Sequence, residues 1–78
     1  MLTLEEALDR NTEYKAIAPV GSVWLHGKTE HVYFIEKHTV REHDLCPCVV
    51  YTRWSDHSLC WVRPTYQFLD GRFKRMEN

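Results

Sequence analysis

Hydrophobic residues gather in two neighbouring stretches of the chain, and their pattern predicts a β-hairpin. Val49–Arg53 and Ser58–Arg63 are both rich in β-branched and aromatic residues, which is typical of strands. Ser55-Asp56 lies between them and suits a turn, because both side chains readily bond to the backbone. We therefore expect the region from Cys46 to Leu69 to organise the fold.

The length of the loop in this hairpin decides which side chains face the core. A loop of two or four residues places Val50 opposite Trp61, Thr52 opposite Leu59 and Tyr51 opposite Cys60. Opposite residues share a face, so Val50, Leu59 and Trp61 then form the face with the larger apolar mass. We expect these three residues in the core. A loop of three residues would shift the pairing by one position and scramble this assignment.

The region after the hairpin predicts a turn and a last strand. Pro64 cannot donate a hydrogen bond to a neighbouring strand, so it should end the second strand or lie on an edge. Thr65–Leu69 is too short for a stable helix and fits a single 3₁₀ turn. Asp70-Gly71 indicates a turn, and Arg72–Met76 alternates polar and apolar residues, as a half-buried strand does.

The N-terminal residues predict a short helix over residues 1–11. Thr3 and Glu6 have the spacing of a capping box, and Leu4 and Leu8 fall on one apolar stripe. A helix of this length is marginal alone and must pack on something. It either docks on the rest of the domain or binds a partner.

Two further strands are expected between the helix and the hairpin. Val20–His26 predicts a strand with Gly21 near its start, and Gly27–Thr29 a turn. His31–His38 predicts a long strand that is apolar on both faces, and Thr39–Leu45 an exposed loop. The result is one domain over residues 1–78, mainly β, with strands over residues 20–76. The order of elements resembles a small antiparallel SH3-like barrel with a short N-terminal helix and a 3₁₀ turn before the last strand.

Motifs in the same region resemble a known family. The stretches VVYTRW and LCWVRPTYQFLDG, with Gly21 and His26-Gly27 upstream, resemble the small bacterial and phage family catalogued as domain of unknown function 1653 (DUF1653). The residues that match its pattern are Gly21, His38, Val49–Tyr51, Trp61–Pro64 and Phe68. The family has no established activity. The resemblance therefore implies the extent of the module, about Val20 to Met76, and a phage origin.

Composition narrows the class of protein. A chain of 78 residues with 44% hydrophobic and 27% charged residues is ordinary for one globular domain. The formal net charge of −1 argues against broad electrostatic capture of nucleic acid. No apolar run approaches the roughly 20 residues of a membrane span, and no signal peptide is recognisable. Three cysteines, an odd number, favour reduced thiols, so we expect a cytoplasmic protein.

The cysteines and histidines raise the question of metal binding and catalysis. The candidates that lie close in the sequence are His38, His43, Cys46, Cys48, His57 and Cys60. Cys-x-Cys is not the usual zinc-knuckle spacing, and the expected register puts Cys48 and Cys60 on opposite faces of the hairpin. A Cys–His pair could act as a nucleophile, but no Gly-rich elbow or carboxylate pair accompanies it. We therefore expect no metal, no cofactor and no enzymatic activity.

A binding site is expected around the hairpin and its following turn. Arginine with aromatic faces suits anionic planar ligands, through bidentate bonds and stacking. An arginine at a strand end can equally pair with a carboxylate or stack on tryptophan. Of the tryptophans, Trp24 and Trp54 are expected to be partly exposed. The candidate residues are Tyr51, Arg53, Trp54, Arg63, Tyr66, His38 and Trp24.

Three functions remain in view. The first is a small binding module that contacts a protein partner or itself, and a phage-encoded chain would use such contact to block a host factor. The second is a binder that sequesters a small anionic nucleotide-like ligand between subunits. The third is a single-stranded nucleic-acid module with stacked aromatics, which the balanced charge disfavours.

Overall fold

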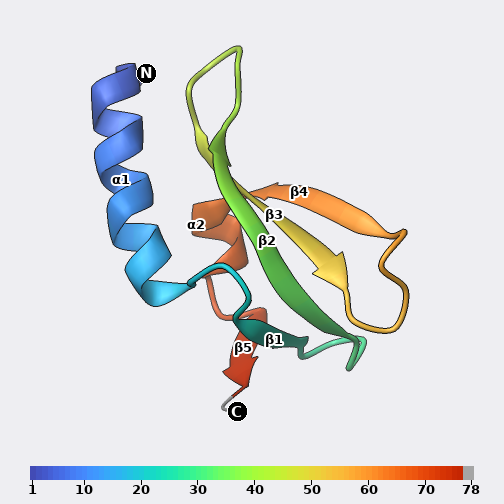
Figure 1. The fold of residues 1–78 in the computed structure, drawn as a ribbon. Helices are drawn as coiled ribbons and strands as arrows, with labels where there is room; N and C mark the ends of the chain where they lie inside the picture. The colour runs from blue at the N-terminus through green and yellow to red at the C-terminus, as the bar shows by residue number, and fades with distance from the viewer. Residues whose placement is uncertain (77–78) are drawn as a thin grey trace.

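In the part of the chain that the structure describes, five antiparallel strands form one sheet, and an N-terminal helix lies against it (Figure 1). The structure is a computed structural model and describes residues 1–76. In chain order the elements are α1 (Leu4–Ile17), β1 (Val23–His26), β2 (Val32–Val40), β3 (Pro47–Arg53), β4 (Cys60–Pro64), α2 (Thr65–Phe68) and β5 (Phe73–Met76). The strand order is β4-β3-β2-β1-β5, so β4 and β5 are the two edges. The predicted mainly-β class with an N-terminal helix is confirmed.

Helix α1 begins where the sequence predicts and ends later. The Thr3 hydroxyl accepts a hydrogen bond from the Glu6 backbone N–H (3.1 Å), and the Glu6 carboxylate accepts one from the Thr3 N–H (3.0 Å). This reciprocal pair satisfies two of the N–H groups that a helix start leaves free. The helix then continues to Ile17, past the expected end near residue 11.

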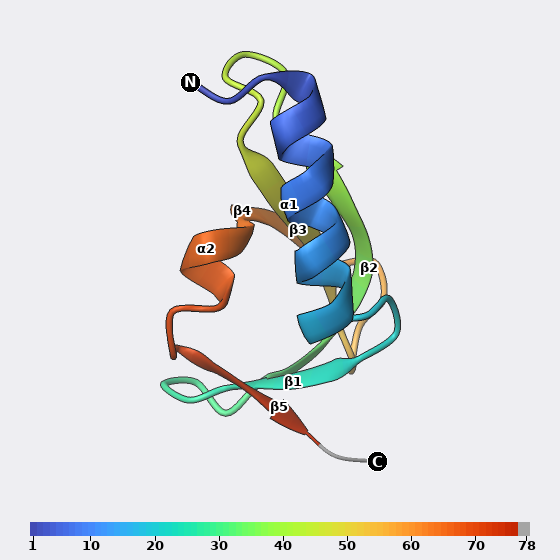
Figure 2. The same cartoon turned by 90° about the vertical axis from the view of Figure 1, so that its left-hand side faces the viewer.

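Small and polar residues, rather than the leucines, dock α1 on the sheet. Ala7, Asn11 and Ala18 are buried, whereas Leu4 and Leu8 are 55% and 53% exposed. The expected Leu4–Leu8 contact stripe is therefore wrong. Small side chains let the helix lie close along β2 and β3 (Figure 2). The Asn11 amide donates from Nδ2 to the carbonyl oxygen of Thr39 on β2 at 3.0 Å, which anchors the helix at its middle.

Strands β2 and β3 extend into the region expected to be a loop. β2 runs to Val40, and β3 starts at Pro47, so the connection shortens to Arg41–Cys46. Pairs such as Thr39–Cys48 and Val40–Pro47 continue the ladder beyond the apolar run. Backbone pairing with a neighbouring strand therefore holds polar residues in extended structure here.

The register of the β3–β4 hairpin differs by one from the expected pairing. Tyr51 lies opposite Trp61 and Thr52 opposite Cys60, instead of Tyr51 opposite Cys60. The cause is the loop: Arg53 donates from its N–H to the Leu59 carbonyl oxygen (3.0 Å), which leaves the five residues 54–58 between the strands. An odd loop length shifts every pair by one position.

The shift changes which residues form the core. Val49 and Tyr51 are buried, whereas Val50 is half-buried and Leu59 and Trp61 are 39% and 38% exposed. The expected core of Val50, Leu59 and Trp61 is therefore wrong. The core cluster is Ala18, Trp24, Tyr33, Ile35, Val49, Tyr51, Phe68 and Phe73.

The two edges of the sheet approach each other over this core. The guanidinium carbon of Arg63 on β4 lies 5.7 Å from the ring centroid of Phe73 on β5. Helix α2 connects these edges, and its Phe68 stacks on Phe73 with ring centroids 4.1 Å apart. The Leu69 N–H bonds to the Thr65 carbonyl oxygen (3.0 Å), so this connection is an α-helical turn rather than the expected 3₁₀ turn.

Neither helix within residues 1–76 combines the length and hydrophobicity that crossing a lipid bilayer requires.

Candidate functional site

Side chains from all five strands surround one small hollow, which we call the aromatic hollow. Its volume is about 180 Å³. It is lined by His26, Thr29, Tyr33, Tyr51, Trp61, Arg63 and Phe73. Residues from both edges of the sheet, Arg63 on β4 and Phe73 on β5, therefore line the same hollow.

Three aromatic rings make one wall of the aromatic hollow. Tyr51 and Trp61 face each other across the β3–β4 ladder, and their rings stack at 6.2 Å with an angle of 21°. Tyr33 on β2 meets both rings edge-on, at 5.3 Å from Tyr51 and 5.5 Å from Trp61. Edge-to-face and offset-stacked rings attract each other, so the cluster is held rigidly. Trp61 is the most exposed of the three and forms the accessible part of the wall.

Arg63 supplies the positive charge of the aromatic hollow. It lies two residues after Trp61 on β4, so its side chain is on the same face of the strand. Its Nε donates to the Tyr51 hydroxyl at 3.2 Å, and its guanidinium lies over Phe73. Within residues 1–76, its Nη1 and Nη2 groups have no hydrogen-bond partner and no carboxylate pairs with it. Four N–H donors are thus free to bind an anion.

His26 adds a further donor at the rim. Its Nδ1 accepts a hydrogen bond from the Thr29 N–H (3.3 Å) and lies 2.9 Å from the Thr29 hydroxyl oxygen. With Nδ1 as the acceptor, the neutral ring carries its proton on Nε2. The ring stands edge-on to Phe73 at 4.8 Å. Among residues 1–76 no acidic side chain lines the aromatic hollow, so the positive charge of Arg63 favours an anion there.

The structure brings together only two of the seven residues expected to form the site. Tyr51 and Arg63 line the aromatic hollow. Arg53 and Trp54 line a separate hollow of about 240 Å³ beside the β1–β2 turn. There the Nη2 group of Arg53 lies 2.9 Å from Nε2 of His31. Trp54 is 58% exposed, as expected.

Two other expected residues have structural contacts. Trp24 is only 6% exposed, so the expectation that it is partly exposed is wrong. Its Nε1 donates to the Ser22 hydroxyl (2.9 Å), and its ring meets Phe68 edge-on at 5.3 Å. His38 lies with Nε2 2.6 Å from the Ala18 carbonyl oxygen. This contact ties β2 to the segment that leaves α1.

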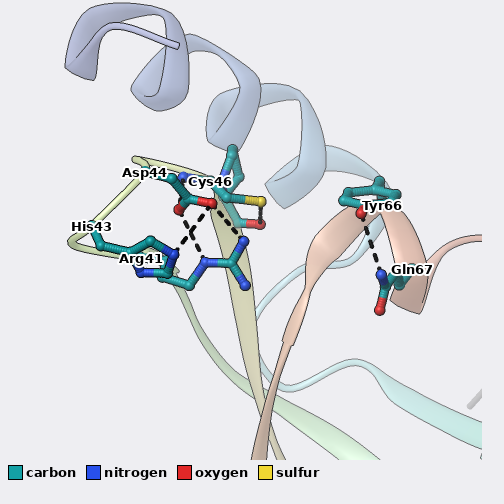
Figure 3. Close-up of polar contacts among 7 residues, drawn as sticks. Arg41, His43, Asp44, Cys46, Tyr66 and Gln67 are labelled. Carbon is teal, nitrogen blue, oxygen red and sulfur yellow. Dashed lines mark hydrogen bonds and ion pairs between the residues drawn. The ribbon is translucent and has the colours of Figure 1, made fainter. Parts of the chain in front are cut away.

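Tyr66 belongs to a third and larger hollow, which we call the helix groove. Its volume is about 340 Å³, and it lies between the start of α1, the β2–β3 connection and α2. The residues around it are Met1, Leu2, Arg10, Tyr14, Asp44, Cys46, Pro47 and Tyr66. Tyr66 accepts a hydrogen bond at its hydroxyl from the Gln67 amide (3.2 Å), apart from the polar cluster on the connection (Figure 3).

Asp44, the acidic residue beside the helix groove, has its hydrogen-bond partners within its own loop. Arg41 donates from Nε (3.0 Å) and Nη2 (2.6 Å) to the two carboxylate oxygens of Asp44 (Figure 3). The Cys46 N–H bonds to the same carboxylate at 3.1 Å. The hydrogen bonds from Arg41, and then that from Cys46, hold the pKa of Asp44 well below its usual range. Asp44 therefore closes the β2–β3 connection and leaves little capacity for a ligand.

The cysteines are dispersed. Cys48 is buried, and burial raises the pKa of its thiol, which makes the thiolate scarcer. Cys60 is exposed and, with the shifted register, shares a face of the hairpin with Cys48. The expectation of opposite faces is therefore wrong, but Cys60 lies opposite Thr52, four residues from Cys48 along β3. No group of three His, Cys, Asp or Glu within residues 1–76 is placed to hold a metal ion.

Sequence reasoning missed most of the aromatic hollow. Tyr33, Phe73, His26 and Thr29 were not candidates, and Trp61 was expected in the core. Apart from His26 and Thr29, which lie three residues apart, these residues come from separate strands, so no local motif links the set. The one available signal was the hairpin itself, because the shifted register places Trp61 and Arg63 on the same face as Tyr51.

A scan against models of protein families, a search of curated proteins and a search of solved structures each found no match. The resemblance to DUF1653 therefore stays a prediction, and the function rests on the geometry of the site.

Proposed function

We propose that the protein is a non-enzymatic binding module that contacts a protein partner and receives one acidic side chain of that partner in the aromatic hollow. The observation that carries this proposal is the guanidinium of Arg63. It sits among aromatic rings, half-buried, with free Nη1 and Nη2 groups and no carboxylate partner within residues 1–76. An arginine placed in this way binds carboxylates strongly, because it can donate two parallel hydrogen bonds.

The size of the aromatic hollow favours a single side chain. Sites for whole small molecules usually measure about 300 to 1,000 Å³, and this hollow holds about 180 Å³. A glutamate side chain has two methylene groups, which would pack against Tyr33 and Trp61 while the carboxylate meets Arg63. A phage-encoded module, as the family resemblance implies, would use this contact to block a host factor.

A nucleotide-like anion is the second candidate. A phosphate would use the same Arg63 donors, and the exposed part of Trp61 offers a stacking surface for a base. A nucleotide would have to extend well beyond the aromatic hollow. Single-stranded nucleic acid would rely on the same stacking but gains little from a net charge of −1.

We further propose that the sheet is a small barrel of the SH3-like type. The support is its strand order, with β5 beside β1 and a helical turn between β4 and β5, together with the approach of Arg63 to Phe73. In barrels of this size, strands curl until the edges meet. Such a curl would make the aromatic hollow a mouth of the barrel.

The proposal is tested by nuclear magnetic resonance titration of the ¹⁵N-labelled protein. The probes are a blocked glutamate peptide flanked by small residues, its glutamine twin, ATP and an oligo-dT strand. We expect the glutamate peptide to shift the Trp61 indole and Arg63 Nε signals, and the glutamine peptide to leave them unchanged. Arg63→Gln should abolish the shifts.

Arg53→Gln is the matched control, because Arg53 is also a half-buried strand arginine but lines a different hollow. It should leave the titration unchanged. If the glutamate peptide binds Arg63→Gln as well as the unaltered protein, an acidic anchor is wrong. If ATP binds saturably and neither peptide shifts any signal, the ligand is a nucleotide rather than a protein partner. If only the oligo-dT strand binds, the ligand is nucleic acid.

A further inference from the structure

Strand β4 is an edge of the sheet whose outer side carries exposed apolar residues. Within residues 1–76, only β3 pairs with it (Figure 1). Cys60, Trp61 and Val62 are all exposed, and Val62 is 64% exposed. Natural edge strands are usually protected by lysine, an early proline or a bulge. β4 has an arginine and a proline only at its end, so its first three residues are unprotected.

The backbone groups of β4 alternate between β3 and solvent. The bond from the Arg53 N–H to the Leu59 carbonyl identifies these two residues as a hydrogen-bonded pair. Such pairs recur at every second position of an antiparallel ladder, so Trp61 and Arg63 also point their N–H and C=O groups toward β3. The backbone groups of the other three residues of β4 therefore point outward, away from β3. These residues are Cys60, Val62 and Pro64. Pro64 lacks an N–H and loses no ladder bond there.

We propose that β4 pairs antiparallel with β4 of a second copy of this chain, about a two-fold axis at Val62. Val62 is the midpoint of Cys60–Pro64, so this axis gives the fullest overlap of the two strands. The two Val62 residues then exchange N–H···O=C bonds, and each Cys60 N–H meets the partner's Pro64 carbonyl. Every outward N–H of the strand finds an acceptor.

The side chains support a second copy as the occupant of this edge. In the proposed register Trp61 lies opposite the partner's Arg63, in a non-hydrogen-bonded pair where side chains are closest. Arginine over tryptophan is a favourable cation–π pair. An axis at Arg63 would instead oppose two like charges. Because Trp61 and Arg63 line the aromatic hollow, the two hollows join into one groove across the axis, and each copy contributes a residue beside the other's site.

This inference goes beyond the proposed function and does not depend on it. An edge of five residues is smaller than the standard interface of about 800 Å² per partner. We therefore expect a weak dimer that forms as protein concentration rises. Sedimentation velocity over a wide concentration range measures it. A wild-type chain that stays monomeric at the highest concentration overturns the proposal.

Substitutions at Val62 locate the interface. Val62→Pro removes the outward N–H from each copy and leaves the β3 ladder intact, so the association constant should fall about tenfold or more. Val62→Lys keeps the N–H but opposes two charges at the axis and should also weaken the dimer. Val62→Thr, which keeps both shape and N–H, should dimerise like the wild type. Unchanged association in both Val62→Pro and Val62→Lys overturns the β4 interface.

A cross-link tests the register. In a Cys60→Ser background, Val62→Cys places two thiols opposite each other with Cα atoms about 5.5 Å apart, within disulfide reach. Oxidation should give a covalent dimer, and Cys60→Ser alone should give none. If the variant forms a dimer in sedimentation but gives no cross-link through position 62, the proposed register and the joined groove are wrong.

Discussion

Replacing Asn11 by aspartate should detach α1 from the sheet at neutral pH and restore its docking in acid. The side chain of Asn11 is buried, and its Nδ2 donates to the Thr39 carbonyl oxygen at 3.0 Å. A carbonyl oxygen needs a hydrogen-bond donor opposite it, and the amide nitrogen of Asn11 supplies one. Asp has nearly the same shape as Asn, but ionised aspartate sets a negatively charged oxygen against that carbonyl.

The size of the effect follows from the two changes in the Asn11→Asp variant. Losing one hydrogen bond costs about 1 kcal/mol, and a buried charge without a partner costs about 3 to 5 kcal/mol. A chain of 78 residues has a total stability of roughly 4 to 12 kcal/mol. Asn11→Asp should therefore remove a large share of the free energy of unfolding at pH 7, whereas Asn11→Ala should remove about 1 to 2 kcal/mol.

The pH dependence of the stability of Asn11→Asp shows whether the loss comes from a buried charge or only from an altered helix. Burial raises the folded-state pKa of the new carboxyl, and the protonated form can donate to the Thr39 oxygen. Its stabilising contribution is therefore complete below the ordinary pKa of aspartate, about 3.9, and is lost as the pH rises through the raised folded-state pKa. Urea unfolding followed by circular dichroism at several pH values measures this. Equal stability of Asn11→Asp and Asn11→Ala at pH 7 would refute the docking described here.

Three further predictions concern the cap, the core and the β2–β3 connection. Thr3→Ala should lower the free energy of unfolding by about 1 kcal/mol in thermal or urea unfolding, because the helix loses its N-cap. Phe68→Ala should cost about 3 to 5 kcal/mol by the same assay, whereas Tyr66→Ala, on the exposed side of the same helix, should cost about 0.5 kcal/mol or less. Asp44→Asn should be less stable than the wild type at pH 7. Since Arg41 lowers the pKa of Asp44, that difference should disappear as the pH falls from about 4 toward the folded-state value, in urea unfolding at each pH.

Much of the secondary structure could be predicted because its signals are local. The capping box at Thr3 is a matter of spacing, and the strands are runs of β-branched and aromatic residues interrupted by turn residues. The end of α1 could not be predicted in this way. Its docking residues include Ala7 and Asn11, which leave no apolar stripe, and the bond from Asn11 to β2 links positions 28 residues apart.

The error in the hairpin came from a single quantity, the parity of its loop. Ser55-Asp56 suggested a short turn, but the bond from Arg53 to Leu59 encloses five residues. That one shift moved Trp61 from the expected core to the face shared with Tyr51 and Arg63. Tyr51 and Arg63 were chosen correctly as site residues. The expected register nevertheless placed Trp61 in the core, so the site that they share with Trp61 was not predicted.

The sequence by itself determined the mainly β class, the succession of strands along the chain, the N-terminal helix and its cap, because each depends on neighbouring residues. Only the tertiary structure decided the register between β3 and β4 and the docking of α1. It also decided the meeting of Arg63 with Phe73 from opposite edges of the sheet. Those outcomes depend on loop length, twist and close packing between distant segments, which no stretch of the chain encodes alone.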